Sequence, residues 1–254
     1  MRMEVSSFYD VMFNTVAQAK FVHTISAGYV TGAVFVLAVS AYFMIRGRNL
    51  DMAKRSMTVA VSFGLASALS VVVLGDESGY VANNNQKMKL AAMEAMWHTE
   101  KPPAGLTLFG IPDEKNKTTK YAIEIPYVLG IIATRSFSTP LEGIDELTNE
   151  GRERIKKGMT AYGLLEQLKK DPDNEAVQKQ FRQVEPYLGY GLLLKKYTEN
   201  VTDATEQQIE KAATDLHPHV APLFYSFRIM VACGLFFILL FATGFYLSIR
   251  HRLH

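Results

Sequence analysis

The sequence contains a single cysteine and, over three long stretches, almost no charge. Because Cys233 has no second cysteine to pair with, a disulfide within the chain is excluded. Residues 21–45, 56–74 and 223–249 together carry one charged side chain, Arg228, although the chain has 27 basic and 25 acidic residues. A helix on the surface of a soluble protein shows charges along its wet face. These stretches are therefore not ordinary surface helices.

Each stretch is close to or above the roughly 20 apolar residues that a helix needs to cross a membrane. Buried helices of a large soluble core are the alternative, which the length of the stretches and their basic ends disfavour. We expect an all-α integral membrane protein: three transmembrane helices with a long, mainly helical external loop between the second and third. The expected segments are an external or interfacial lead-in (1–20), a transmembrane helix (21–45), a basic cytoplasmic link (46–55), a transmembrane helix (56–74), a periplasmic loop (75–220), a transmembrane helix (221–249) and a cytoplasmic end (250–254).

Basic residues at the ends of the spans predict the orientation. The link between the first two spans has four basic residues against Asp51 alone, and the third span ends in a second basic cluster. Lys and Arg near span ends favour the cytoplasmic side, and three crossings place both clusters there. The loop then faces the periplasm of a bacterium. The start of the chain, MRMEVSSFYD, lacks the uncharged apolar region of a signal peptide. The basic residues are Arg46, Arg48, Lys54 and Arg55 in the link, and Arg250, His251 and Arg252 at the end.

The loop shows the patterns of several helices. We expect a turn out of the second span at 74–85, then a helix over 86–100 that the following prolines stop. The apolar run 125–136 is too short to span a membrane, so it is expected to pack under the loop or lie in the membrane interface. The patterns at 150–170 and 174–196 are typical of amphipathic helices.

Another helix is expected within 202–216, with Thr205 or Asp203 as its N-cap. The net charge of +2 is small. We expect a lipid bilayer as the surroundings of the spans and no nucleic-acid partner.

Three residues in the spans are candidates for chemistry. His23 lies just inside the external end of the first span, and Arg228 and Met230 lie about two turns inside the external end of the third. Imidazole and thioether at one depth on two helices are a possible axial pair for a low-spin haem. An interfacial histidine and a core methionine are the alternatives. Arg228 needs a partner or a route to the interface; a haem propionate, Asp76 or Glu77 would each supply one.

The helix expected at 86–100 carries a second set of candidates. Glu94 and His98 are four residues apart and are predicted to share a helix face. Lys89 and Glu94 are five residues apart, about 140° around a helix, so they are predicted to flank a ligand. Quinol oxidation needs a base for the hydroxyl protons and donors for the oxygens. A solvated charged face, which includes Trp97, is the alternative interpretation.

Several motifs together resemble subunit I of the cytochrome bd-type quinol oxidases, from the first residues of the chain to the last. They are KFVHTISAGYVTGA (20–33), AKRS (53–56), SFGLASALSVVVLGDESGY (62–80), QKMKLAAMEAMW (86–97), LFGIPD (108–113), IPYVLGIIATRS (125–136), GYGLLLKKYT (189–198) and APLFYSFRIMVACG (221–234).

The resemblance implies a role for most candidate residues. His23 and Met230 match the axial ligands of the family's low-spin haem b, and Arg228 matches the arginine beside that haem. Lys89 and Glu94 match the pair that binds and oxidises quinol in the family's periplasmic loop. Acidic residues near the low-spin haem are matched by Asp76 and Glu77. No role is implied for Trp97 or His98.

The resemblance also implies the setting of the chain. The family's subunit I has further spans before and after this region, so we expect an internal fragment with the electron-entry part of a terminal oxidase. The ligands of the high-spin haem b and haem d, where oxygen is reduced to water and a proton-motive force is generated, are expected outside this chain. Expected partners are ubiquinol or menaquinol, subunit II and small accessory subunits, in the bacterial cytoplasmic (inner) membrane. The alternatives are a non-enzymatic three-span receptor or assembly subunit with a partner-binding loop, and a haem-free transporter fragment.

Overall fold

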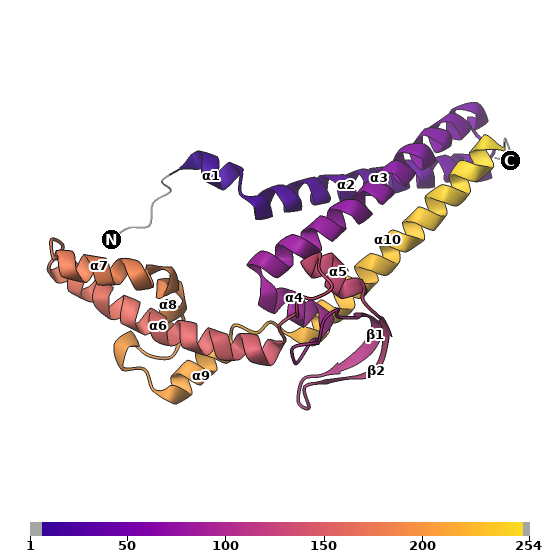
Figure 1. Cartoon of the computed structure of the whole chain (residues 1–254). Helices are drawn as coiled ribbons and strands as arrows, with labels where there is room; N and C mark the ends of the chain where they lie inside the picture. Colours follow the sequence, from indigo (N-terminus) through magenta and orange to yellow (C-terminus); the bar gives the residue numbers. More distant parts are fainter. Residues whose placement is uncertain (1–6, 251–254) are drawn as a thin grey trace. The chain divides into compact units, whose positions relative to one another are not determined.

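The computed structural model describes residues 7–250, which form two compact units. The loop unit comprises Lys87–Gly130 and Phe137–Phe224; the membrane unit comprises residues 7–86, 131–136 and 225–250. Figure 1 labels the helices and strands of both. The first six residues of the chain, and His251 and Arg252 of the predicted cytoplasmic end, lie outside the described residues.

The membrane unit is built on three long apolar helices. They are α2 (Thr15–Ile45), α3 (Leu50–Asn85) and α10 (Val220–Ile249), the last of which belongs to this unit from Tyr225 onward; a short helix, α1 (Phe8–Met12), precedes them. All three are long and apolar enough to cross a membrane, as predicted. Only 6% of the most apolar window of α10 is buried within the chain, so most of its side chains require lipid or other apolar partners.

Small residues let these helices approach closely. A Cβ on Gly64 of α3 would lie 2.4 Å from the ring of Phe241 on α10, and one on Gly244 of α10 would lie 2.7 Å from Val61. Phe241 is fully buried and belongs to one cluster with Val61 and with residues of α2. Such packing of small residues is typical of helices in membranes, where lipid provides no hydrophobic drive for association.

The second long helix differs from the prediction at both ends. It begins at Leu50, inside the predicted basic link, where Gly47 and Asn49 adopt positive φ and turn the chain. It continues to Asn85, so the turn predicted at 74–85 is wrong. The polar residues there are compatible with helix because Asp76 and Glu77 project as half-exposed side chains from it.

The loop unit begins with α4 (Lys87–Glu94) and a hairpin that the sequence analysis did not identify. Strands β1 (Leu106–Asp113) and β2 (Thr118–Ile125) pair antiparallel, with irregular register between Thr107 and Ile111. At the turn, Asp113 accepts hydrogen bonds from Asn116 and pairs with Lys120 at 2.7 Å. These contacts, that of Lys120 above all, hold the pKa of the Asp113 carboxyl well below its usual range.

The rest of the loop unit is helical, as predicted. Its long helix α6 (Ile144–Lys170) packs against shorter elements that follow it in the chain. They are α7 (Glu175–Val184), α8 (Leu188–Leu192), α9 (Glu206–Thr214) and the 3₁₀ helices η1 (Glu185–Tyr187), η2 (Leu193–Lys196) and η3 (Val201–Asp203).

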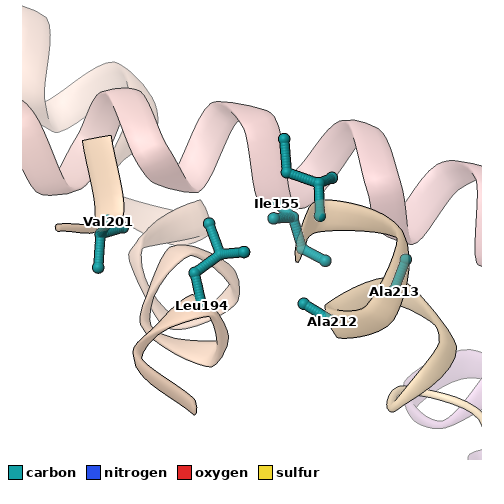
Figure 2. Close-up of a cluster of buried hydrophobic side chains, with 6 residues drawn as sticks. Ile155, Leu194, Val201, Ala212 and Ala213 are labelled. Carbon is teal, nitrogen blue, oxygen red and sulfur yellow. The ribbon is translucent and has the colours of Figure 1, made fainter. Parts of the chain in front are cut away.

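The core of this helical part consists of small and medium aliphatic side chains. Figure 2 shows Ile155 of α6 among residues of η2, η3 and α9. The sequence prediction of Thr205 as N-cap of α9 is confirmed, since its side chain accepts from Gln208 in a capping box. Residues 174–196, predicted as one helix, are divided by the 3₁₀ turn at Pro186.

Candidate functional site

His23 lies on α2 with its ring against α3. A Cβ on Gly75 would lie 3.7 Å from His23 Cε1, which is ordinary van der Waals contact. The Nδ1 atom of His23 is buried and has no hydrogen-bond partner among the described residues. Buried nitrogen atoms are nearly always satisfied, so this arrangement calls for a further group beside the imidazole.

The register of α3 and α10 can be read from their contacts. Thr58 and Ser248 hydroxyls are 2.7 Å apart, Val61 lies against Gly244, and Gly64 lies against Phe241. In an antiparallel pair, each residue gained along one helix is a residue lost along the other. These contacts lie between residues 58–64 of α3 and residues 241–248 of α10.

The shared depth of His23 and Met230 stays a prediction, for which the contact of His23 with Gly75 is the structural support. The prediction assumes that α2 and α10 cross the membrane in the same direction, and both helices do run antiparallel to α3. Met230 is 53% exposed within this chain, so its thioether is not packed into a protein core. Two residues earlier, Arg228 is partly buried, and its Nε atom is fully buried.

Asp76 and Glu77 follow Gly75 on α3 and meet an arginine that the sequence analysis did not single out. Arg135 comes directly after α5 (Val128–Thr134), with a positive φ of 52°. Its guanidinium forms an ion pair with Glu77, lies 4.0 Å from Asp76, and stacks over the Tyr80 ring at 4.3 Å. The acidic residues proposed as partners of Arg228 are thus engaged by Arg135. The apolar run 125–136 packs at its end on α3 through this residue.

Lys89 and Glu94 occupy different faces of α4. Lys89 is exposed, whereas Glu94 is 4% exposed among the buried residues Leu90, Ala91 and Ala92. The predicted separation of the two side chains around the helix is borne out. Lys89 places a donor at the surface of the loop unit, whereas Glu94 places its carboxyl group in the interior.

The prediction that Glu94 and His98 share a helix face is wrong, because α4 ends at Glu94. His98 is exposed and lies 3.5 Å from Asp145. Trp97, by contrast, is 5% exposed, and its indole nitrogen donates a hydrogen bond to Thr119 of β2. The interpretation of Trp97 as part of a solvated face is therefore wrong too. Among the residues that the structure describes, no three His, Cys, Asp or Glu side chains converge as for a bare metal ion.

Comparison with known proteins assigns the family. The family model of cytochrome bd terminal oxidase subunit I matches residues 1–254. The chain belongs to this family. It is 38% identical over 253 residues to subunit 1 of the cytochrome bd-II ubiquinol oxidase of Escherichia coli, covering the whole chain and 49% of that relative. It is 31% identical over 157 residues to subunit 1 of the cytochrome bd ubiquinol oxidase of Bacillus subtilis, covering 62% of this chain and 34% of that relative.

A solved structure agrees on the fold. The bd oxidase of Geobacillus thermodenitrificans matches with a TM-score of 0.50 and 17% identity, over 95% of this chain and 60% of that one. The chain thus spans half or less of the length of the curated relatives described above. Membership of a cytochrome bd oxidase family implies haem cofactors. The buried Nδ1 of His23, which lacks a hydrogen-bond partner within residues 7–250, and the half-exposed Met230 fit such a group.

Proposed function

We propose that this chain is the electron-entry part of a cytochrome bd-type quinol oxidase. The observation that carries the proposal is the buried Nδ1 atom of His23, which has no hydrogen-bond partner among the described residues, in a member of this family. His23 and Met230 would hold a low-spin haem b, with Arg228 beside it. When bound, that haem supplies a one-electron redox centre, and a His/Met ligand pair raises its potential.

The residues of α4 provide the proton chemistry. Oxidation of one quinol to quinone releases two protons and two electrons. Lys89, with three N–H donors, orients a quinol oxygen, and the buried Glu94 carboxylate accepts a hydroxyl proton.

The surroundings follow from the orientation of the spans. The basic link after α2 favours the cytoplasmic side of a bacterial inner membrane, so the loop unit faces the periplasm and the quinol protons leave there. We infer that ubiquinol or menaquinol is the substrate and that subunit II and small accessory subunits complete the enzyme. Reduction of oxygen to water belongs to high-spin haems b and d, whose ligands lie outside this chain. Proton release on one side and proton uptake on the other would generate a proton-motive force.

The ligand assignment is tested by spectroscopy on the assembled oxidase. His23→Ala is expected to remove the low-spin b-type signal from the reduced-minus-oxidised spectrum and to spare the high-spin signals. His98→Ala is the matched control, because that histidine is exposed in the loop unit, and its spectrum should be unchanged. An unaltered low-spin signal in His23→Ala rejects the assignment.

The loop assignment needs a separate measurement. Glu94→Gln keeps the shape of the side chain but removes its ability to accept a proton at neutral pH. We expect quinol turnover to fall on the order of 10²-fold, as for a lost general base, with an intact low-spin spectrum. If turnover with an artificial electron donor fell equally, the role of Glu94 in quinol oxidation would be rejected.

A further inference from the structure

The residue after Glu94 adopts a backbone conformation that normally requires glycine. Ala95 has a φ of 51°, its N–H donates to Ala92 O at 3.2 Å, and the Met96 N–H donates to Ala91 O at 2.9 Å. These bonds form a Schellman motif, in which the left-handed residue is usually glycine. For an alanine the left-handed conformation is strained, because its Cβ comes too close to the following carbonyl oxygen. Surrounding contacts must therefore hold Ala95 in place.

The hairpin supplies one of these contacts. The Thr119 hydroxyl of β2 donates to the Ala95 carbonyl oxygen at 3.2 Å, and the Trp97 indole N–H donates to Thr119 Oγ at 3.3 Å. Thr119 thus donates one hydrogen bond, to the Ala95 carbonyl oxygen, and accepts one, from the Trp97 indole N–H. The direction of both hydrogen bonds is therefore fixed. Ala95 and Trp97 are each 5% exposed, so little water competes for these groups.

The beginning of α6 holds the same segment from another direction. The N–H groups of Ile144 and Asp145 donate to the carbonyl oxygens of Met96 and Trp97, at 2.9 and 3.1 Å. A Cβ on Gly143 would lie 2.3 Å from the backbone of His98, so only glycine permits this approach. The four residues after Glu94 are thereby fixed by the hairpin and by α6 together.

We propose that Thr119 and Trp97 are positioning residues for Glu94, which they hold in place through the left-handed Ala95. The inference rests on the proposed role of Glu94 as proton acceptor. A base must lie within hydrogen-bond reach of the proton that it accepts, and a displacement of about 1 Å can cost 10²-fold in rate. Loss of the Thr119 bond lets Ala95 relax, and the end of α4 that carries Glu94 moves with it.

The test compares three single variants of the assembled oxidase. Thr119→Val removes the hydroxyl at nearly constant volume, Thr119→Ser keeps it, and Trp97→Phe removes the indole N–H that orients it. Thr119→Val is expected to lower kcat with quinol on the order of tenfold, with Trp97→Phe following in the same direction. Thr119→Ser should restore most of the rate. Turnover with an artificial donor should stay close to that of the parent enzyme.

A glycine at position 95 provides a second, more specific test. Glycine adopts positive φ without cost, so Ala95→Gly makes the conformation independent of Thr119. The double variant Thr119→Val with Ala95→Gly is expected to recover quinol turnover and the parent pH profile of kcat. A displaced acceptor changes that profile, whereas a loosened fold lowers activity at every pH.

The outcomes separate this inference from the proposed function. If Glu94→Gln impairs quinol oxidation but Thr119→Val does not, the positioning role is rejected and the role of Glu94 stands. Thr119→Val and Glu94→Gln are measured in the same enzyme. If Thr119→Val lowers quinol turnover although Glu94→Gln has no effect, both the positioning role and the proposed role of Glu94 are overturned. Loss of artificial-donor turnover in Thr119→Val, or no recovery with Ala95→Gly, also overturns the inference.

Discussion

Arg135 and Glu77, which are 58 residues apart in the sequence, form an ion pair that joins the end of α5 to α3. The Arg135 guanidinium also stacks over Tyr80, one helical turn beyond Glu77. Arg135→Leu is expected to lower the stability of the oxidase by about 1 kcal/mol, because a half-exposed ion pair contributes up to about 1 kcal/mol and an exposed cation–π contact a similar amount. Thermal inactivation in detergent measures the change.

A double-mutant cycle with Glu77→Gln isolates the pair. We expect the combined variant to lose less than the sum of the two single variants. Strictly additive losses would show that Arg135 and Glu77 do not interact in the protein.

The small size of Gly75 is expected to leave room for the His23 ring. A Cβ there makes ordinary contact with the ring, so Gly75→Ala should retain the low-spin b-type spectrum, whereas the longer side chain of Gly75→Leu should displace the imidazole and weaken that signal. The reduced-minus-oxidised spectra of the two variants, at equal amounts of assembled enzyme, check this. Full retention of the signal in Gly75→Leu would contradict the placement of His23 against α3.

The three spans were predictable because their signal is local and dense. Within each long apolar run, successive residues all indicate a membrane-spanning helix, and no partner from a distant part of the sequence is needed for the prediction. The shared depth of His23 and Met230 stays a prediction; it rests on the argument that helices of similar length that run in one direction place residues at similar distances from their ends at similar depths.

The details of the loop were not predictable for the opposite reason. The sequence near Glu94 does not indicate a helix end, because alanine occupies the left-handed position where a glycine would predict a C-cap. Contacts from Thr119 and Ile144, far along the chain, stabilise that end. The hairpin was missed because its turn lacks the Asn-Gly or Asp-Gly signal. Arg135 was missed as a site residue because its partners come from another helix.

The close approach of α6 and α8 predicts a strong effect at Gly158. A Cβ there would lie 2.2 Å from Gly191 N and 2.5 Å from Tyr187 O, so Gly158→Ala must push the backbones apart. We expect a loss of about 1–3 kcal/mol, as for other overpacked cores. Hydrogen exchange of α6 and α8 in the assembled enzyme reports it as faster exchange. Gly189→Ala is the matched control on α8: no atom lies within 4 Å of its Cβ, so exchange should be unchanged or slower.

Glu100 is expected to make the stability of the loop unit depend on pH. Burial, and secondarily the nearby Glu124, raise the pKa of Glu100 above its ordinary value of 4.5, against the opposing hydrogen bond from the Gly105 N–H. A group whose pKa is higher in the folded state stabilises that state fully below its unfolded pKa. The contribution is lost as the pH rises through the raised folded pKa. Glu100→Gln, which carries no charge at any pH, should therefore stabilise the protein relative to the parent above this window more than below it.

The measurement is the unfolding temperature of parent and variants at pH 4 and pH 7. Glu124→Gln removes the smaller cause of the shift, so it should change the difference between the two pH values in the same direction but less than Glu100→Gln does. If Glu100→Gln shifted the unfolding temperature equally at both pH values, the carboxyl group of Glu100 would not titrate differently in the folded and unfolded chain, and its burial against Glu124 would have to be revised.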